Sequence, residues 1–284
     1  MKYTPLFDPK AHEARKNPRA VRYLYDHDEH LVLAINVALA TRRPLLLRGD
    51  PGSGKSTVAA DIAFCLGRTY HEQVITSRIQ AQDLLFRFDA VRRLGAIQAS
   101  ATGKSARVAD SDAAYVEPGV LWWAFDPTSA SAHGRRGSTS KRAAAPKKRK
   151  GAVVLLDEID KADPDVPNDL LVVLDSHWFD VPELDHKRIE APKDLALLLV
   201  ITTNGERELP AAFLRRCVVY DLKTPEGKDL TAIVRQHFPV KEVSDTIVQA
   251  AQAKLVALTS DAAKARLRVP STASSSTPSA PVAT

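Results

Sequence analysis

Residues 45–58, with the sequence LLLRGDPGSGKSTV, restrict the fold more than any other stretch of this chain. They contain the complete phosphate-binding pattern G-x-x-x-x-G-K-[ST], which runs from Gly49 to Ser56. A short apolar run precedes the pattern, and a segment with helical character, residues 57–66, follows it. We therefore expect a phosphate loop between a buried strand and the N-terminus of a helix, rather than an ordinary glycine-rich turn. That placement directs backbone N–H groups and the positive end of the helix dipole at an anion.

The residue types within this loop predict a nucleoside triphosphate with Mg²⁺ as its ligand. Gly52 and Gly54 let the backbone curl around phosphate without a Cβ in the way. Lys55 is expected to neutralise the β- and γ-phosphates, and the Ser56 hydroxyl to bind Mg²⁺. We predict that ATP is bound by Gly49, Asp50, Pro51, Gly52, Ser53, Gly54, Lys55, Ser56 and Thr57.

Three further apolar runs, residues 152–156, 195–202 and 217–222, predict the rest of the sheet. They are continuous rather than alternating, which is typical of strands buried on both faces of a parallel sheet. Helices are expected between them, most clearly at residues 168–176. The pattern predicts an α/β fold, namely a P-loop NTPase domain with a doubly wound parallel sheet. The other local predictions are a helix at 29–40 capped by Asp26 or Asp28, a second strand at 73–77, helices at 80–94, 117–125, 228–237 and 243–258, and a hairpin at 178–189.

Composition divides the chain of 284 residues into four parts. We expect an irregular N-terminal arm at 1–25, the α/β domain at 26–222, a short helical lid at 223–268 and a disordered tail at 269–284. Within the domain, residues 127–150 are rich in Ser, Ala, Lys and Arg and predict a flexible insertion. The insertion holds eight basic residues and no acidic one, and subtracting those eight charges from the net charge of +6 leaves −2. The basicity of the chain therefore belongs to one segment.

Cysteine usage and hydropathy exclude several other classes of protein. Cys65 and Cys217 lie far apart without His or Cys neighbours at metal-binding spacing, so we predict buried thiols and neither a disulfide nor a zinc site. The first residues lack the apolar core of a signal peptide. The longest purely apolar run, residues 195–201, is too short to span a bilayer. We expect a cytoplasmic protein with no membrane attachment.

Polar residues that follow two of the predicted strands indicate hydrolysis of the bound nucleotide. Asp157 and Glu158 end the strand at 152–156. Asp157 has the chemistry to hold Mg²⁺ through its water shell, and Glu158 to polarise the attacking water as a general base. Asn204 follows the strand at 195–202, where its amide can hydrogen-bond both that water and the γ-phosphate.

Arg215 and Arg216, here called the arginine pair, directly precede the last predicted strand. They are placed to reach outward into a neighbouring subunit. An arginine supplied in this way contributes ~10³–10⁵ in rate in other nucleotide hydrolases. The competing role is a surface salt bridge, for one of the two side chains but not for both.

The order GDPGSGKS, LLDEID, ITTN and LPAAFLRRC resembles the AAA+ ATPases, and most closely their MoxR-like branch, over about residues 31–222. Residues 80–94 followed by EPGVLWWAF resemble the helix-2 insertion of that branch, which faces a central pore. The resemblance implies that Asn204 is sensor 1 and that Arg216 is the arginine finger, with Arg215 as the second choice. It also implies Mg²⁺-dependent ATP hydrolysis in a homo-oligomer, a hexameric ring, that remodels a client protein, often with a partner carrying a von Willebrand A domain.

Two departures from the family pattern leave other functions open. The basic insertion at 127–150 lies outside that pattern and raises the alternative of a DNA-associated AAA+ ATPase that contacts nucleic acid through phosphates. The lid has room for only two or three helices, which raises the alternative of a nucleotide-regulated scaffold that binds ATP without hydrolysing it. A small-molecule kinase fits less well. A monomeric kinase has no combined use for Asp157 and Glu158 (here called the acid pair), Asn204 and the arginine pair.

Overall fold

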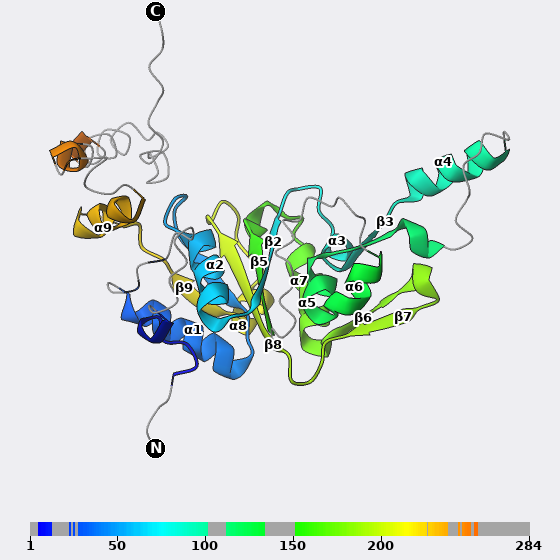
Figure 1. Ribbon diagram of the computed structural model, residues 1–284, viewed down its shortest axis with the longest axis horizontal. Helices are drawn as coiled ribbons and strands as arrows, with labels where there is room; N and C mark the ends of the chain where they lie inside the picture. The colour runs from blue at the N-terminus through cyan, green and yellow to red at the C-terminus, as the bar shows by residue number, and fades with distance from the viewer. Residues whose placement is uncertain are drawn as a thin grey trace, which may run out of the picture.

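The computed structural model of the chain describes residues 5–12, 23, 25, 28–101, 112–133, 151–225, 227–237, 244, 246–250 and 253–254. A five-stranded sheet with the strand order β2-β5-β8-β1-β9 forms the centre of the molecule (Figure 1). Each neighbouring pair in it is parallel, which confirms the predicted fold class. Its strands are β1 (Leu45–Arg48), β2 (Thr69–Val74), β5 (Gly151–Asp157), β8 (Ala196–Thr203) and β9 (Val218–Asp221).

Helices and two short antiparallel sheets surround this sheet. The helices are α1 (Glu29–Thr41), α2 (Lys55–Leu66), α3 (Ala81–Leu85), α4 (Ala90–Ala101), α5 (Val120–Phe125), α6 (Pro127–His133), α7 (Val166–Ser176), α8 (Ala211–Arg216) and α9 (Gly227–His237). Short 3-10 turns are η1 (Lys10–His12), η2 (Asp112–Tyr115), η3 (Ile159–Lys161) and η4 (Pro182–Leu184). One two-stranded sheet pairs β3 (Phe86–Phe88) with β4 (Val116–Pro118), and the other is a hairpin of β6 (Trp178–Val181) and β7 (Lys187–Glu190).

Successive residues of the central strands lie in two different hydrophobic cores. Val153 of β5 packs in one core with residues of α1 and α2, whereas Val154 packs in the other with residues of α5 and α7. Because side chains along a strand point alternately to opposite faces, both faces of the sheet are covered. This explains the continuous apolar runs in the sequence and shows that the sheet is doubly wound.

Several local predictions are confirmed. The helix predicted at 29–40 is α1, and the Asp28 side chain caps it by accepting a hydrogen bond of 3.0 Å from the Leu31 amide. The helix at 168–176 is α7, the hairpin at 178–189 is the β6–β7 pair, and the helix at 228–237 is α9. Both cysteines are free and buried.

No helix in the described part of the chain is long and apolar enough to cross a membrane.

The second strand is displaced from its predicted position. It spans Thr69–Val74 rather than 73–77, and lies at the edge of the sheet, where it pairs with β5 alone. An edge strand is only partly covered, so its side chains here are partly buried or exposed and lack a continuous apolar run. Ile75, which lies within the predicted range, is fully buried just beyond the strand.

The prediction of a single helix at 80–94 is wrong. The chain forms α3, then leaves the helix at β3 to pair with β4, and resumes as α4. The Gly119 amide donates to the Leu85 carbonyl at 2.8 Å, which holds the two chain segments together at this point. Pairing with a distant segment therefore overrides the helical spacing of the apolar residues.

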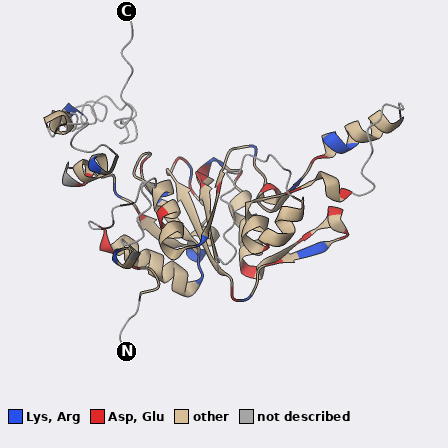
Figure 2. Ribbon diagram, viewed as in Figure 1, with Lys and Arg blue, Asp and Glu red and all other residues tan. Residues whose placement is uncertain are grey.

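The predicted insertion at 127–150 does not begin as a flexible segment. Residues 127–133 form α6, whose Ala130 is fully buried, and Ser129 accepts a hydrogen bond of 3.2 Å from the Trp122 indole. Residues 134–150, half of the predicted lid helix at 243–258 and the predicted tail at 269–284 lie outside the described residues. Over the described residues, Lys and Arg are interspersed with Asp and Glu (Figure 2).

Candidate active site

The phosphate loop leaves the C-terminal end of β1 and enters α2 at Lys55, as predicted from the sequence. Gly49 has a φ of 156°, and a Cβ there would lie 2.5 Å from the Leu222 carbonyl oxygen. Gly54 precedes α2 with a φ of 92°, in the left-handed region that favours glycine. A Cβ on Gly54 would lie 3.2 Å from the Tyr23 ring, so the loop is closely packed against neighbouring backbone and aromatic surface.

Lys55 is buried between the phosphate loop and the end of β8. Its ammonium group donates to the carbonyl oxygens of Gly49 (2.6 Å) and Asp50 (2.9 Å) and to Oδ1 of Asn204 (2.8 Å). Burial lowers the pKa of Lys55, and the carboxylates of Asp157 and Asp50 oppose this effect. The structure thus brings together two residues, Lys55 and Asn204, that are 149 positions apart in the sequence.

Asp157 ends β5 and contacts the first turn of α2. The Ser56 hydroxyl donates to Oδ2 of Asp157 at 3.0 Å. The Thr202 hydroxyl donates to Oδ1 of the same carboxylate and accepts a hydrogen bond of 2.9 Å from the Glu158 amide. Thr202 was not predicted as a site residue, although a polar side chain near the end of an apolar strand was a usable signal.

Glu158 follows Asp157 with a φ of 63°, which is uncommon for a residue other than glycine. Its Oε1 accepts from the Asn204 amide nitrogen at 3.3 Å, and its Oε2 accepts from the Lys161 ammonium at 2.6 Å. The hydrogen bond to Glu158 raises the pKa of Lys161. Lys161 was also not predicted, because its role depends on the turn η3 that brings it back to Glu158.

Asp160 fixes the backbone beyond β8. It is only 2% exposed, and its Oδ2 accepts from the amides of Asn204 (3.2 Å) and Glu206 (3.0 Å). Its Oδ1 has no hydrogen-bond partner among the described residues. Asp160 therefore orients the segment that carries Asn204.

The donor set fits a magnesium nucleotide. The Ser56 hydroxyl and the Asp157 carboxylate supply oxygen ligands of the kind that Mg²⁺ prefers. Ser53 in the loop is fully buried, and its hydroxyl has no partner among the described residues. The loop thus contains a buried hydroxyl with unused hydrogen-bonding capacity, beside the amides at the start of α2 that have no partner within the helix.

The arginine pair lies at the N-terminal ends of the strands, opposite to the phosphate loop. Both arginines are in the last turn of α8, directly before β9, whose Val218 pairs with Leu45 at the start of β1. The phosphate loop leaves the opposite end of β1, so the structure does not bring the pair to the loop of its own chain. Arg216 instead lies with its Nε atom 3.5 Å from Oδ2 of Asp175 in α7.

The family model of the AAA domain (dynein-related subfamily) matches residues 44–217. The chain belongs to this AAA family. The match extends from the start of β1 to the end of α8 and includes the phosphate loop, the acid pair, Asn204 and the arginine pair. No curated protein matches the sequence of this AAA protein.

Two solved structures illustrate what the AAA protein resembles. One is a provisionally assigned ATPase from Cytophaga hutchinsonii, with 14% identity, a TM-score of 0.47, and coverage of 80% of this chain and 54% of that one. The other is a mutant of RuvB from Thermotoga maritima, with 17% identity, a TM-score of 0.40, and coverage of 75% of this chain and 50% of that one. The AAA protein spans about half the length of each.

Proposed function

We propose that the protein is a Mg²⁺-dependent ATPase of the AAA+ class whose active site is completed by a neighbouring copy. The observation that carries this proposal is the hydrogen-bonded chain from Lys55 through Asn204 to Glu158 at the C-terminal edge of the sheet. A phosphate-binding cation, a polar orienting group and a general base therefore lie next to one another. This grouping supports attack of water on a bound phosphoryl group as the reaction.

Each residue has a separate task in this reaction. The loop amides and Lys55 bind the phosphates, and Ser56 and Asp157 hold Mg²⁺, which when bound offsets charge on the phosphate oxygens. Glu158 accepts a proton from the attacking water, and Asn204 orients that water. Thr202 and Asp160 keep the acid pair and Asn204 in register through their hydrogen bonds.

A second copy is needed because the arginine pair and the phosphate loop of one chain lie at opposite ends of the sheet's strands. In a ring of identical subunits, Arg216, with Arg215 as the second choice, reaches the nucleotide of the next subunit. Coulombic stabilisation of the transferring phosphoryl group by such an arginine accounts for a large part of the rate in related chemistry. We extend the proposal to a hexameric ring in the cytoplasm.

The finer assignment within the proposal is a MoxR-like, chaperone-like remodeller of protein clients, working with a partner that carries a von Willebrand A domain. It is supported by the β3–β4 pair and α4, which project from the body of the domain (Figure 1). On α4, Val91 and Leu94 are 84% and 56% exposed, respectively, so the projecting helix presents apolar side chains. Such a surface suits contact with another polypeptide.

The test is sedimentation with and without ATP, combined with steady-state ATP hydrolysis. Wild type should assemble with ATP, Glu158→Gln should assemble but hydrolyse at least about 100-fold more slowly, and Arg216→Ala should lose turnover by a similar factor. Glu190→Gln, which removes an exposed carboxylate of β7, is the matched control and should retain full turnover. Equal, slow hydrolysis by wild type and Glu158→Gln would contradict the enzyme assignment and favour a scaffold that only binds ATP.

A further inference from the structure

One guanidinium group, that of Arg43, holds the C-terminal end of α8. Its Nε donates to the Arg216 carbonyl at 3.0 Å, and its Nη2 donates to the carbonyls of Cys217 (2.9 Å) and Arg215. Arg43 thus contacts the backbone of both members of the arginine pair and of the residue that follows them. It lies 172 positions earlier in the chain than Arg215, so the contact is purely tertiary.

The chemistry of helix ends explains why this contact matters for α8. The last carbonyls of a helix have no partner within it, and a helix of six residues has few internal hydrogen bonds to hold its end. A cation at the C-terminus also interacts favourably with the helix dipole. Arg43 supplies both the hydrogen-bond donors and the positive charge, because its planar guanidinium group donates to three carbonyls at once.

The same junction is tied to β1 by the backbone. The Val218 amide donates to the Pro44 carbonyl at 2.8 Å, and β9 then continues in parallel register with β1. On the other side, Asp175 lies 3.5 Å from the Arg216 side chain. The backbone of the arginine pair is therefore held by Arg43, the start of β9 is held by Pro44, and the Arg216 side chain lies beside Asp175 of α7.

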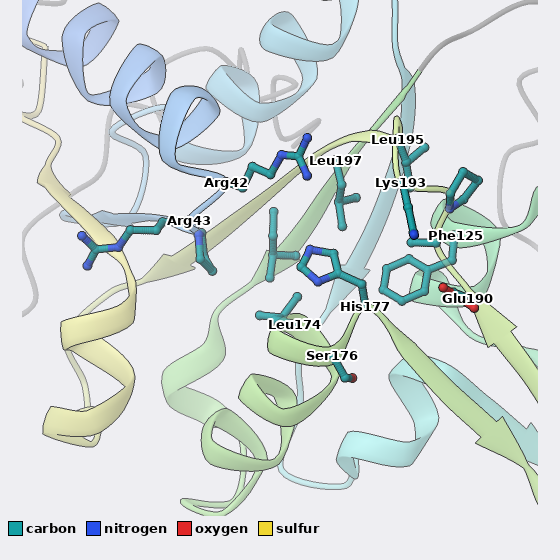
Figure 3. A pocket seen from close by; sticks show the side chains of 14 residues that line it. Arg42, Arg43, Phe125, Leu174, Ser176, His177, Glu190, Lys193, Leu195 and Leu197 are labelled. Carbon is teal, nitrogen blue, oxygen red and sulfur yellow. The ribbon is translucent and has the colours of Figure 1, made fainter.

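The neighbouring arginine does not share this contact. Arg42 and Arg43 both line a pocket of about 410 Å³, but they point in different directions (Figure 3). Arg42 extends over the pocket, whereas Arg43 turns away from it toward the end of α8. Among the described residues, no hydrogen bond or ion pair connects the Arg42 side chain to α8. Removal of either arginine changes the net charge equally, and only Arg43 holds the helix.

We propose that Arg43 is a positioning residue that sets the place of the arginine pair, and through it the rate of ATP hydrolysis in the adjacent subunit. This inference rests on the proposed function. Arg43 touches neither the nucleotide nor the reacting atoms of its own subunit. Its effect arises because a finger displaced by about 1 Å can lose on the order of 10²-fold in rate.

The first measurement compares Arg43→Gln with Arg42→Gln in the full-length protein. Arg43→Gln should lower kcat by about 10- to 100-fold while the KM for ATP stays within about twofold, since the nucleotide-binding loop is intact. Arg43→Lys should recover only part of the activity, because an ammonium group cannot span three carbonyls. Arg42→Gln should keep kcat near wild type. Equal losses in the two Gln variants would overturn the proposal.

The second measurement mixes subunits and separates positioning in trans from damage within the subunit. Glu158→Gln subunits have an inactive site but an intact arginine pair, whereas Arg43→Gln subunits have an intact site and a displaced pair. Mixed assemblies should therefore hydrolyse ATP several-fold faster than either variant alone. If Arg43→Gln is slow and gains nothing from mixing, Arg43 acts only on the stability of its own subunit and the proposal fails.

The proposed function has its own, distinguishable outcome in this experiment. Arg216→Ala is the reference, and its loss of turnover should likewise be recovered by mixing with Glu158→Gln. Full turnover in Arg216→Ala would overturn the shared active site, and the role of Arg43 with it. Loss of turnover in Arg216→Ala combined with full turnover in Arg43→Gln would keep the shared site and overturn the role of Arg43 alone.

Discussion

Thr202 shows how a single hydroxyl organises the candidate active site. It is fully buried, and it both donates to the Asp157 carboxylate and accepts from the Glu158 amide. A hydroxyl is suited to this task because it is a donor and an acceptor at once. The acid pair at the end of β5 is thereby connected to β8, the strand that Asn204 directly follows. Substitution at Thr202 is expected to disturb both acids together, although this side chain takes no part in the reaction itself.

His71 on β2 makes the stability of the protein sensitive to mild acid. Burial lowers the pKa of His71 to about 4, and its Nε2 has no hydrogen-bond partner among the described residues. The unfolded chain has a His pKa of about 6.5, so as the pH falls below 6.5 it takes up a proton that the folded protein takes up only near pH 4. The contribution is therefore neutral above pH 6.5, becomes increasingly destabilising between pH 6.5 and 4, and is constant below that.

The measurement is urea denaturation at pH 7 and pH 5. Wild type should lose about 2 kcal/mol more of its free energy of unfolding between these values than His71→Gln, which has no titrating group at this position. Other groups titrate alike in both proteins, so the difference isolates His71. Parallel pH profiles for the two proteins would show that His71 is protonated as easily in the folded state as in the unfolded one.

At the scale of elements, two glycines, one just before α5 and one within α4, have opposite roles. Gly119 precedes α5, and a Cβ there would lie 2.5 Å from the Leu84 carbonyl oxygen, whereas a Cβ on Gly95 within α4 would meet nothing within 4 Å. Gly119→Ala should therefore destabilise the protein by about 1–3 kcal/mol, because backbone must move. Gly95→Ala should stabilise it by about 0.5–1 kcal/mol through helix propensity. Thermal or urea unfolding of the two variants checks the sign, and a loss of stability in Gly95→Ala would indicate a contact absent from this structure.

Elements that are buried on both faces or carry a phosphate-binding motif could be predicted from the sequence. The strands β1, β5 and β8 are continuous apolar runs, and the loop, the acids and Asn204 follow them at fixed places. The edge strand β2 and the break between α3 and α4 could not be predicted, because partial burial weakens the apolar pattern and pairing with β4 is set by a segment 30 residues away. Thr202, Asp160 and Lys161 escaped prediction because their roles depend on contacts across strands or around a tight turn.

At the scale of the whole molecule, the N-terminal segment is part of the core. Phe7 is fully buried against α1, and its backbone exchanges two hydrogen bonds with the Asn36 side chain, of 2.9 Å and 2.8 Å. This segment was predicted as an irregular arm, and the described portion packs against the domain without regular strands. Loss of the contact leaves a cavity in the core beneath α1.

Phe7→Ala should therefore lower the free energy of unfolding by about 3–5 kcal/mol. Leu6 is 58% exposed, and Leu6→Ala, its adjacent control, should change stability by less than about 0.5 kcal/mol. Urea denaturation of both variants provides the comparison. A similar, small effect of both substitutions would mean that the segment detaches from the domain in solution.

In the proposed ring, the length of β1 fixes the spacing between the residues that this subunit supplies to two different active sites. In that ring, Arg43, just before the strand, holds the arginines that reach the neighbouring subunit, and the phosphate loop directly after the strand binds the nucleotide of its own subunit. The strand has only four residues, each adding about 3.3 Å. One inserted residue would lengthen this spacing by that amount and turn every following side chain to the opposite core. Insertions and deletions should therefore be tolerated in the β6–β7 turn long before they are tolerated in β1.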